Sequence, residues 1–320
     1  MRLFAISCWL LALLAQPTAA AAAASSPALQ PLEQQLEALV AARSGEVGIA
    51  ALDLRTGESV SINGDEPFPM ASTVKIAVAA AYLAQVDHGR RTLDQMIGGR
   101  SAYGLMEAMM IRSDNYATDL LIRNLGGPET VQQWVSWHSV KDMRVDRTIA
   151  QLLRARRDLR DVRDSSTPLA MVELLRKIDS GNVLKPESRA LLLDMMARCK
   201  TGKNRIRGLL PAGIRVENKT GTLNGLSDDV GFITLPDGRR IALVVFARYG
   251  ANRPRTIAEA ARTIYYGFSS PRWTPFSAPA AAAEATNRRN ASRRWGRCAG
   301  RVRRRPPGRG QRGTARPARR

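Results

Sequence analysis

The stretch FPMASTVKIAVAAAYL, residues 68–83, places Ser72 three residues before Lys75 at the start of an apolar, alanine-rich segment. This segment predicts a helix over residues 73–86. Because residues three apart in a helix lie on one face, the hydroxyl of Ser72 and the amine of Lys75 are expected side by side. Ser72 is then either a nucleophile with Lys75 as proton acceptor, or a helix cap beside a solvated lysine.

Patterns typical of strands occur on both sides of a helical middle. The fold class predicted from this order is α+β: an antiparallel sheet of about five strands from both chain ends, flanked by helices, with an inserted all-helical region. The expected strands cover residues 47–54, 59–62, 215–220, 229–235 and 240–248. Besides residues 73–86, the expected helices cover residues 102–111, 117–124, 129–137, 168–178, 186–199 and 255–268.

Both ends of the chain differ in composition from the middle. Met1 and Arg2 precede an apolar run and then small residues, so residues 1–24 are interpreted as a secretory signal peptide. The alternative is an uncleaved anchor, although the apolar run is short for a membrane span and no later stretch would span a membrane. The domain is predicted over residues 25–270, with a disordered Ala/Pro/Arg-rich basic tail over 271–320. We therefore expect a secreted or periplasmic protein.

The formal net charge of +21 is concentrated in the tail. Residues 271–320 contain 15 Arg and a single acidic residue, Glu284. Such a tail would adhere to any polyanion, but its few aromatic residues are irregularly spaced and form no stacking platform for single strands. No specific nucleic-acid partner is expected.

Cysteine and histidine are too few for the usual metal or disulfide frameworks. Cys8 falls in the predicted signal and Cys298 in the tail, which leaves Cys199 alone in the domain. His88 and His138 are the only histidines, so a multi-histidine zinc site is excluded. We expect neither a metal nor another cofactor.

Two later triplets decide how Ser72 is interpreted. Ser113-Asp114-Asn115 lies just before a predicted helix, and Lys219-Thr220-Gly221 ends a predicted strand. Alone, each triplet would be a cap or a turn, and one Ser-x-x-Lys pair arises by chance in a chain of this length. All three in this order are specific for a serine acyl-transfer site.

On these motifs the chain resembles the class A serine β-lactamases and the wider penicillin-recognising serine hydrolases. The similar segments are FPMASTVK, IRSDNYATDLLIRNLGGPETV, TGKNRIRGLLPAG and ENKTGT. The resemblance runs from about residue 47 to about residue 268. It implies a β-lactamase/transpeptidase-like fold and a small-molecule β-lactam or a cell-wall peptide as substrate, and we expect a monomer with no membrane span once the signal is removed.

The resemblance also implies a role for each motif residue. The implied catalytic residues are the nucleophile Ser72, its proton acceptor Lys75, the proton relay Ser113 and the cation Lys219. The implied substrate-binding residues are Asn115 for a side-chain amide, and Thr220, Gly221, Thr222 and Arg205 around the substrate carboxylate. Backbone N–H groups of Ser72 and Thr222 would form the oxyanion hole, whereas Arg207 is expected to be structural.

One part of the family pattern is missing. Class A members hydrolyse the acyl-enzyme with a glutamate on an Ω-shaped loop, and Arg147 and Asp164 match the residues that close this loop. Two residues after the arginine stands Ile149, with Leu153 at the asparagine position. Counting back from Asp164 gives Gln151 instead, because the loop is two residues longer. Neither side chain can take a proton from water, so slow deacylation is expected.

The loop contains acidic residues that could replace the glutamate. Asp146, Asp158 and Asp161 are the candidates, but pairing with the arginines of the same loop is the favoured interpretation. Three functions follow. The first is a β-lactam hydrolase, and the second is a hydrolase of D-alanyl peptides, or of another amide or ester, that β-lactams inhibit. The third is a polyanion-binding protein that acts through its tail.

Overall fold

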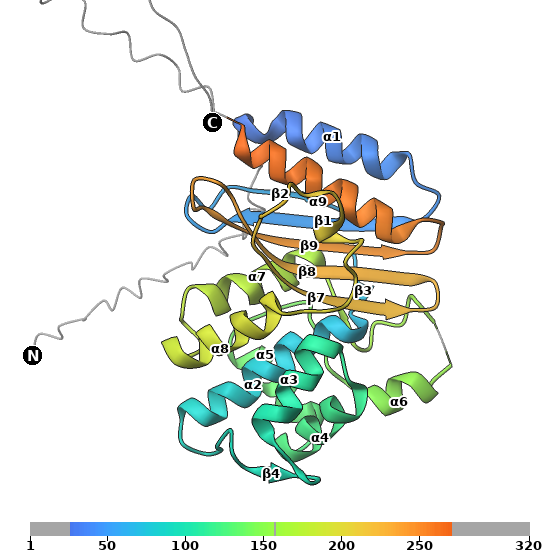
Figure 1. Cartoon of the computed structure of the whole chain (residues 1–320). Coiled ribbons are helices and arrows are strands. Elements are labelled where there is room, and N and C mark those ends of the chain that lie inside the picture. Colours follow the sequence, from blue (N-terminus) through green and yellow to red (C-terminus); the bar gives the residue numbers. More distant parts are fainter. Residues whose placement is uncertain (1–25, 157, 271–320) are drawn as a thin grey trace, which may run out of the picture. The chain divides into compact units, whose positions relative to one another are not determined.

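A five-stranded antiparallel sheet forms one layer of the computed structural model (Figure 1). The strand order is β2-β1-β9-β8-β7, so the first long strand pairs with the last. This register runs from Glu46 opposite Arg248 to Asp53 opposite Ile241. The strands are β1 (Glu46–Asp53), β2 (Ser59–Ile62), β7 (Val216–Leu223), β8 (Leu226–Thr234) and β9 (Arg240–Arg248). The predicted pairing of both chain ends in one sheet is confirmed.

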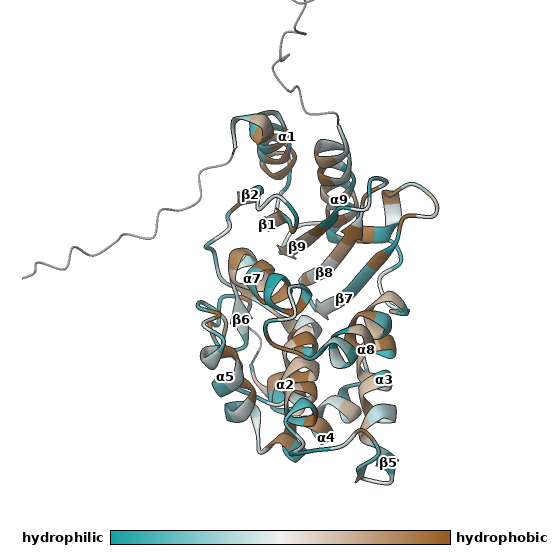
Figure 2. Cartoon of the chain, turned by 90° about the vertical axis from the view of Figure 1, so that its left-hand side faces the viewer, coloured by the Kyte–Doolittle hydropathy of each residue, from teal (hydrophilic) through white to brown (hydrophobic). Residues whose placement is uncertain are grey.

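Helices cover both faces of this sheet (Figure 2). On one face, α1 (Gln30–Ala41) and α9 (Arg253–Ser269) pack against each other and bury an apolar layer. Val47 and Ile49 of β1 contribute to this layer together with Ile264 of α9. The other face meets α7 (Pro168–Asp179) and the inserted helical region. The predicted α+β architecture is therefore confirmed.

The inserted region is built around α2 (Lys75–Asp87). Every residue of α2 from Lys75 to Ala84 is buried, as expected for a helix that is apolar on all sides. Its alanines let neighbouring helices approach closely, and this core continues to Phe246 on the sheet. The surrounding helices are α3 (Ala102–Arg112), α4 (Asn115–Leu125), α5 (Pro128–Trp137), α6 (Ile149–Arg154) and α8 (Pro186–Ala197).

The short elements connect these layers. They are the 3-10 turns η1 (Pro27–Leu29), η2 (Ala71–Val74) and η3 (Ile206–Leu209), and the strand pairs β3 (Phe68–Pro69) with β6 (Ser165–Ser166) and β4 (Met96–Ile97) with β5 (Arg100–Ser101). The pair of β3 and β6 joins the segment before Ser72 to the segment after Asp164.

Several expected boundaries were wrong. Strand β8 begins at Leu226 and not at residue 229, and single ends of α4, α8 and α9 differ from the expected ones by two residues. The helix that follows Ser72 begins as the 3-10 turn η2, and α2 itself begins at Lys75. Strand β7 does not end at Gly221 but continues to Leu223, where a hairpin at Asn224 and Gly225 leads into β8. The third motif therefore lies inside a strand. Helix α1 was not expected at all.

The structure describes residues 26–156 and 158–270. The predicted signal, residues 1–24, and the predicted basic tail, residues 271–320, lie outside these ranges, as do Cys8 and Cys298. Within the described ranges, no helix combines the length and the hydropathy that crossing a bilayer requires.

Candidate active site

Ser72 lies in a strained turn between β3 and α2. Ala71, directly before it, has a φ of 46°, a left-handed conformation that is uncommon for a residue with a side chain and costs about 1–3 kcal/mol. The turn is held by Thr73, whose N–H and hydroxyl both donate to the carbonyl of Met70. The hydroxyl of Ser72 caps no helix and makes no hydrogen bond with any residue that the structure describes. It is half-buried and free to meet a substrate.

The amine of Lys75 is buried below this turn. Its Nζ lies 2.8 Å from the carbonyl oxygen of Ser113, 3.2 Å from Ser113 Oγ and 2.7 Å from Asn115 Oδ1. These contacts connect the first motif to the second. The solvated-lysine interpretation is therefore excluded, because Lys75 is 0% exposed.

A second buried amine reaches the same hydroxyl from the sheet. Lys219 on β7 donates to Ser113 Oγ at 2.9 Å and to the carbonyl of Thr220 at 3.0 Å. Burial and, as the second cause, the nearby charge of Lys219 together lower the pKa of Lys75 to about 7, although Asp114 and Asp119 oppose the shift. Burial also lowers the pKa of Lys219 to about 8. Near neutral pH, Lys75 can therefore exchange a proton.

The second motif is shaped by two helix ends. Ser113 terminates α3 in a left-handed conformation with a φ of 60°, which turns the chain sharply. Asp114 then caps α4, because its carboxylate accepts a hydrogen bond from the N–H of Ala117 at 2.8 Å. The capping role is thus filled by Asp114, and Ser113 and Asn115 are left to face Lys75.

The third motif borders the site from the sheet. The guanidinium of Arg205 donates to Thr222 Oγ1, to the carbonyl of Gly221 and to the carbonyl of Asp228, each at 2.7 Å. Arg207 instead donates to Asn218 and to two backbone carbonyls, as its predicted structural role requires. Only glycine fits at position 221, because a Cβ there would lie 2.7 Å from the carbonyl of Met70.

These groups surround a cleft of about 280 Å³. The residues that line the cleft do not include Lys75, Lys219 or Gly221. The two lysines contact the lining through their hydrogen bonds with Ser113 Oγ. The described residues that line the cleft include no aspartate, glutamate or histidine. The lining residues are Ser72, Ser113, Asn115, Thr201, Gly202, Arg205, Thr220 and Thr222.

Residues 31–268 match the protein family described as the β-lactamase enzyme family. The chain is 32% identical to the extended-spectrum β-lactamase PER-1 of Pseudomonas aeruginosa, over 73% of this chain and 86% of the relative. The chain belongs to the class A β-lactamase family.

Solved β-lactamases share the fold. A β-lactamase from Chitinophaga pinensis superposes with a TM-score of 0.69 at 30% identity, covering 73% of this chain and 98% of the other. An ancestral class A β-lactamase gives a TM-score of 0.69 at 35% identity, with the same coverage. The predicted family and fold are thus confirmed.

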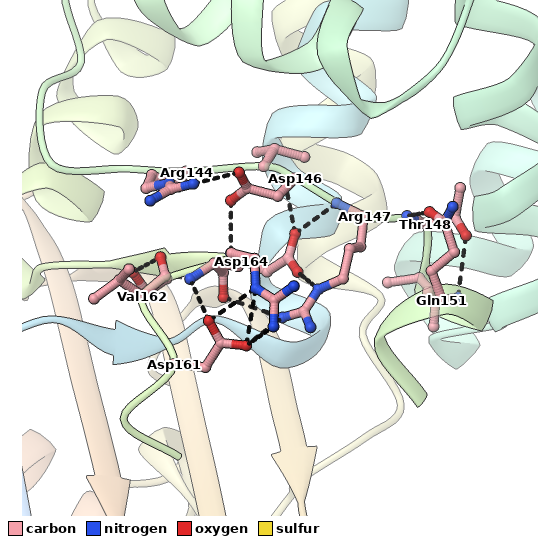
Figure 3. Close-up of polar contacts among 12 residues, drawn as sticks. Arg144, Asp146, Arg147, Thr148, Gln151, Asp161, Val162 and Asp164 are labelled. Atoms are coloured by element: carbon pink, nitrogen blue, oxygen red, sulfur yellow. Dashed lines mark hydrogen bonds and ion pairs between the residues drawn. The ribbon is translucent and has the colours of Figure 1, made fainter. Parts of the chain in front are cut away.

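The loop expected to resemble the Ω loop of class A β-lactamases is closed at its ends by an ion pair (Figure 3). Arg147 Nε donates to Asp164 Oδ2 at 2.5 Å, and the backbone N–H groups of Asp146 and Arg147 donate to Asp164 Oδ1. Of the acidic candidates for a base, Asp146 pairs with Arg144. Asp161 pairs with Arg147 and Arg163, while Asp158 accepts the N–H of Arg160. The favoured interpretation is therefore confirmed for Asp161, whereas Asp146 pairs with an arginine just before the loop and Asp158 accepts only a backbone N–H.

The structure favours Ile149 as the residue at the family's glutamate position. Ile149 begins α6 two residues after Arg147, it is buried, and its N–H donates to Asp119 Oδ1 at 2.7 Å. Gln151 is instead exposed and folds back to accept the N–H of Thr148 in a capping box.

Two residues at the site were not predicted. Thr201 Oγ1 lies 2.5 Å from Thr220 Oγ1, and it lies in the same segment as Arg205, which the sequence did single out. Asp228 on β8 is fully buried beside Gly221, and neither of its carboxylate oxygens has a hydrogen-bond partner among the described residues. No sequence signal marks a buried acid that lacks a partner.

A larger groove of about 780 Å³ lies elsewhere, between α2, α5 and the segment before α8. It contains none of the predicted site residues. Among the described residues, no group of three or more His, Cys, Asp or Glu could hold a metal ion.

Proposed function

We propose that this protein is a serine hydrolase that opens the ring of β-lactams through an acyl-enzyme on Ser72. The convergence of two buried amines on Ser113, beside the free hydroxyl of Ser72, carries this proposal. Ser72 Oγ attacks the lactam carbonyl as Lys75 takes its proton, and the carbon–nitrogen bond breaks. The departing nitrogen receives the proton of Ser113, which Lys75 replaces.

The remaining polar groups suit a substrate with a carboxylate. Lys219 supplies positive charge, and the hydroxyls of Thr220 and Thr222 and the guanidinium of Arg205 border the cleft where an anion would bind. Asn115 accepts from Lys75 through Oδ1, and its Nδ2 group is available to donate to the amide of the substrate side chain. Backbone N–H groups of Ser72 and Thr222 would stabilise the developing oxyanion.

Release of the acyl group is proposed to be the slow step. Ile149 presents no group that can activate water, and Leu153, 50% exposed, presents no amide to position one. General-base assistance is worth about 10²–10⁴-fold in rate, so its loss lengthens the lifetime of the acyl-enzyme accordingly. The site thus holds the groups that acylation of Ser72 needs, but the loop supplies no base for release of the acyl group.

The lack of a carboxylate in the cleft also supports a second function. A hydrolase of D-alanyl cell-wall peptides would bind the same carboxylate and be acylated at the same serine, and a β-lactam would inhibit it by forming a lasting adduct. For either function we propose an exported monomer whose partner is a small molecule or a peptide.

A chromogenic cephalosporin tests these functions when colour and intact protein mass are followed together. We expect one adduct per chain and slow turnover, both abolished by Ser72→Ala and unaffected by Ser136→Ala, which changes an exposed helix hydroxyl. A stoichiometric adduct without turnover would favour the peptide hydrolase. Neither adduct nor turnover would overturn the β-lactam proposal.

A further inference from the structure

The acyl-enzyme needs a base that the loop does not supply. Asp119 is the buried carboxylate nearest to the loop helix, but its two oxygens accept the N–H groups of Ile149 and Ala150 at 2.7 and 2.9 Å. The carboxylate is thus occupied in fixing α6. Because the lining of the cleft contains no carboxylate or imidazole, a proton must leave an attacking water through a hydroxyl.

Ser113 is the hydroxyl in the cleft wall that leads to an amine. Its Oγ lies 3.2 Å from Lys75 Nζ and 2.9 Å from Lys219 Nζ. The other hydroxyls of the wall have different partners: Thr201 and Thr220 bind each other, and Thr222 accepts from Arg205. Asn115 also lines the cleft and contacts Lys75, but its amide is no base, so Ser113 is the lining hydroxyl that joins the cleft to a buried amine.

The hydrogen bonds around Lys75 suit a neutral amine as well as a charged one. A neutral Nζ keeps two N–H donors, which match the Ser113 carbonyl and Asn115 Oδ1, and its lone pair can accept the proton of Ser113 Oγ. Lys219, as the ammonium, then donates to the same Ser113 oxygen. Charges facing Lys75 come from Asp114 and Asp119 on the α4 side and from Lys219 on β7.

We propose that Ser113 and Lys75 together act as the general base for hydrolysis of the acyl-enzyme, in place of a loop carboxylate. This inference rests on the proposed acylation of Ser72. A water oxygen bonds to the ester carbon as its proton passes to Ser113 Oγ and the proton of Ser113 passes to Lys75 Nζ. When the bond between that carbon and Ser72 Oγ breaks, Lys75 returns the proton to Ser72, and the product is the ring-opened acid.

The pH dependence of release tests this step without any mutation. The acyl-enzyme is prepared at pH 6 with the chromogenic cephalosporin, freed from excess reagent, and transferred to buffers from pH 5 to pH 10. Loss of the adduct mass is expected to accelerate as the amine loses its proton, with a midpoint near the pKa of about 7, and then to level off. A rate that stays proportional to hydroxide up to pH 10 would overturn the proposal. A rate that is already constant from pH 6 upwards would overturn it too, because a base with the pKa of an ordinary carboxyl group is fully ionised there.

A matched pair of variants separates the relay from the fold. Ser113→Ala, acylated at high reagent concentration, is expected to hold its adduct about 10²-fold longer or more. Adding Ile149→Glu to Ser113→Ala is expected to restore release, since a carboxylate no longer needs the relay. An unchanged adduct lifetime in Ser113→Ala contradicts the inference but leaves the acylation proposal standing. Failure of the unmodified protein to form any adduct contradicts the acylation proposal itself.

Discussion

The side chain of Ile149 has no group that could act as a base, and we propose that this limits release of the acyl group. Ile149 lies at the first turn of α6, and Asp119 fixes the backbone of this turn. The sequence left two alignments of the loop open, because its ends gave different counts. Only the contacts of Gln151 with Thr148 and the burial of Ile149 distinguish the alignments.

Ile149→Glu is expected to shorten the lifetime of the acyl-enzyme by about 10²-fold or more, because it restores a carboxylate base at the position proposed for the family's glutamate. Gln151→Glu is the matched control, since it adds the same charge two residues later on an exposed side chain. Release is measured as decay of the adduct mass. Faster release in Gln151→Glu alone would show that the other alignment is correct.

Asp228 permits a prediction about stability and pH. Burial raises the pKa of its carboxyl group well above the ordinary value, so the folded state retains a proton that the unfolded chain loses above about pH 4. The free energy of unfolding must therefore fall as pH rises from about 4 towards the raised pKa. Asp228→Asn removes this titration, so between pH 4.5 and pH 8 the variant should lose less stability than the unmodified protein. Urea unfolding at both pH values checks this, and an equal effect at both would contradict it.

At the scale of elements, the loop is fastened directly to the turn that carries the nucleophile. The N–H of Met70 donates to the carbonyl of Asp164 at 2.9 Å, while the carboxylate of Asp164 holds the other end of the loop (Figure 3). Asp164 itself has a φ of 54°. Asp164→Asn tolerates this conformation but loses the charge that pairs with Arg147.

Asp164→Asn is expected to destabilise the fold by about 1–3 kcal/mol, because a charged group held by three hydrogen bonds becomes neutral. Asp158→Asn is the control, since Asp158 is an exposed residue of the same loop. Thermal unfolding of both variants measures the difference. Equal midpoints for the two variants would show that the ion pair contributes nothing.

The sequence predicted elements better than it predicted their ends. Short apolar runs between turn signals identified each long strand, and Pro128, Pro168 and Pro186 marked helix starts correctly. The end of β7 was wrong because Lys219, Thr220 and Gly221 have the composition of a turn. In the fold these residues are buried in the middle of a strand, with Lys219 held by Ser113. Tertiary contacts overrode local preference there.

At the scale of the whole molecule, the site lies where two separately buried regions meet. Ser72 and Ser113 come from the helical region, whereas Lys219 and Thr222 come from the sheet. The motif order allowed the sequence to group these residues by family resemblance. It did not give the distances, because the amines meet Ser113 only after segments 38 and 106 residues apart come together.

None of the proposed catalytic or substrate-binding residues lies after β7, so we expect that the chemistry does not need the basic tail. Deleting residues 271–320 is expected to leave turnover within about twofold and the free energy of unfolding within about 0.5 kcal/mol. The deletion retains α9 and the hydrogen bond from Arg239 to the carbonyl of Phe268. Steady-state kinetics and urea unfolding of both forms test this, and lost turnover would give the tail a role in the reaction.

The pairing of β1 with β9 has a consequence for the order of folding on the ribosome. The ion pair of Glu46 and Arg248 joins residues 202 positions apart, so β1 has no central partner until almost the whole domain has been synthesised. At about 5–20 residues per second, the delay is about 10–40 s. During this time the apolar strand that contains Val47 and Ile49 has only β2 to pair with, and it is open to chaperones and to aggregation. The newly made chain is therefore at its most vulnerable before the β9 sequence has emerged.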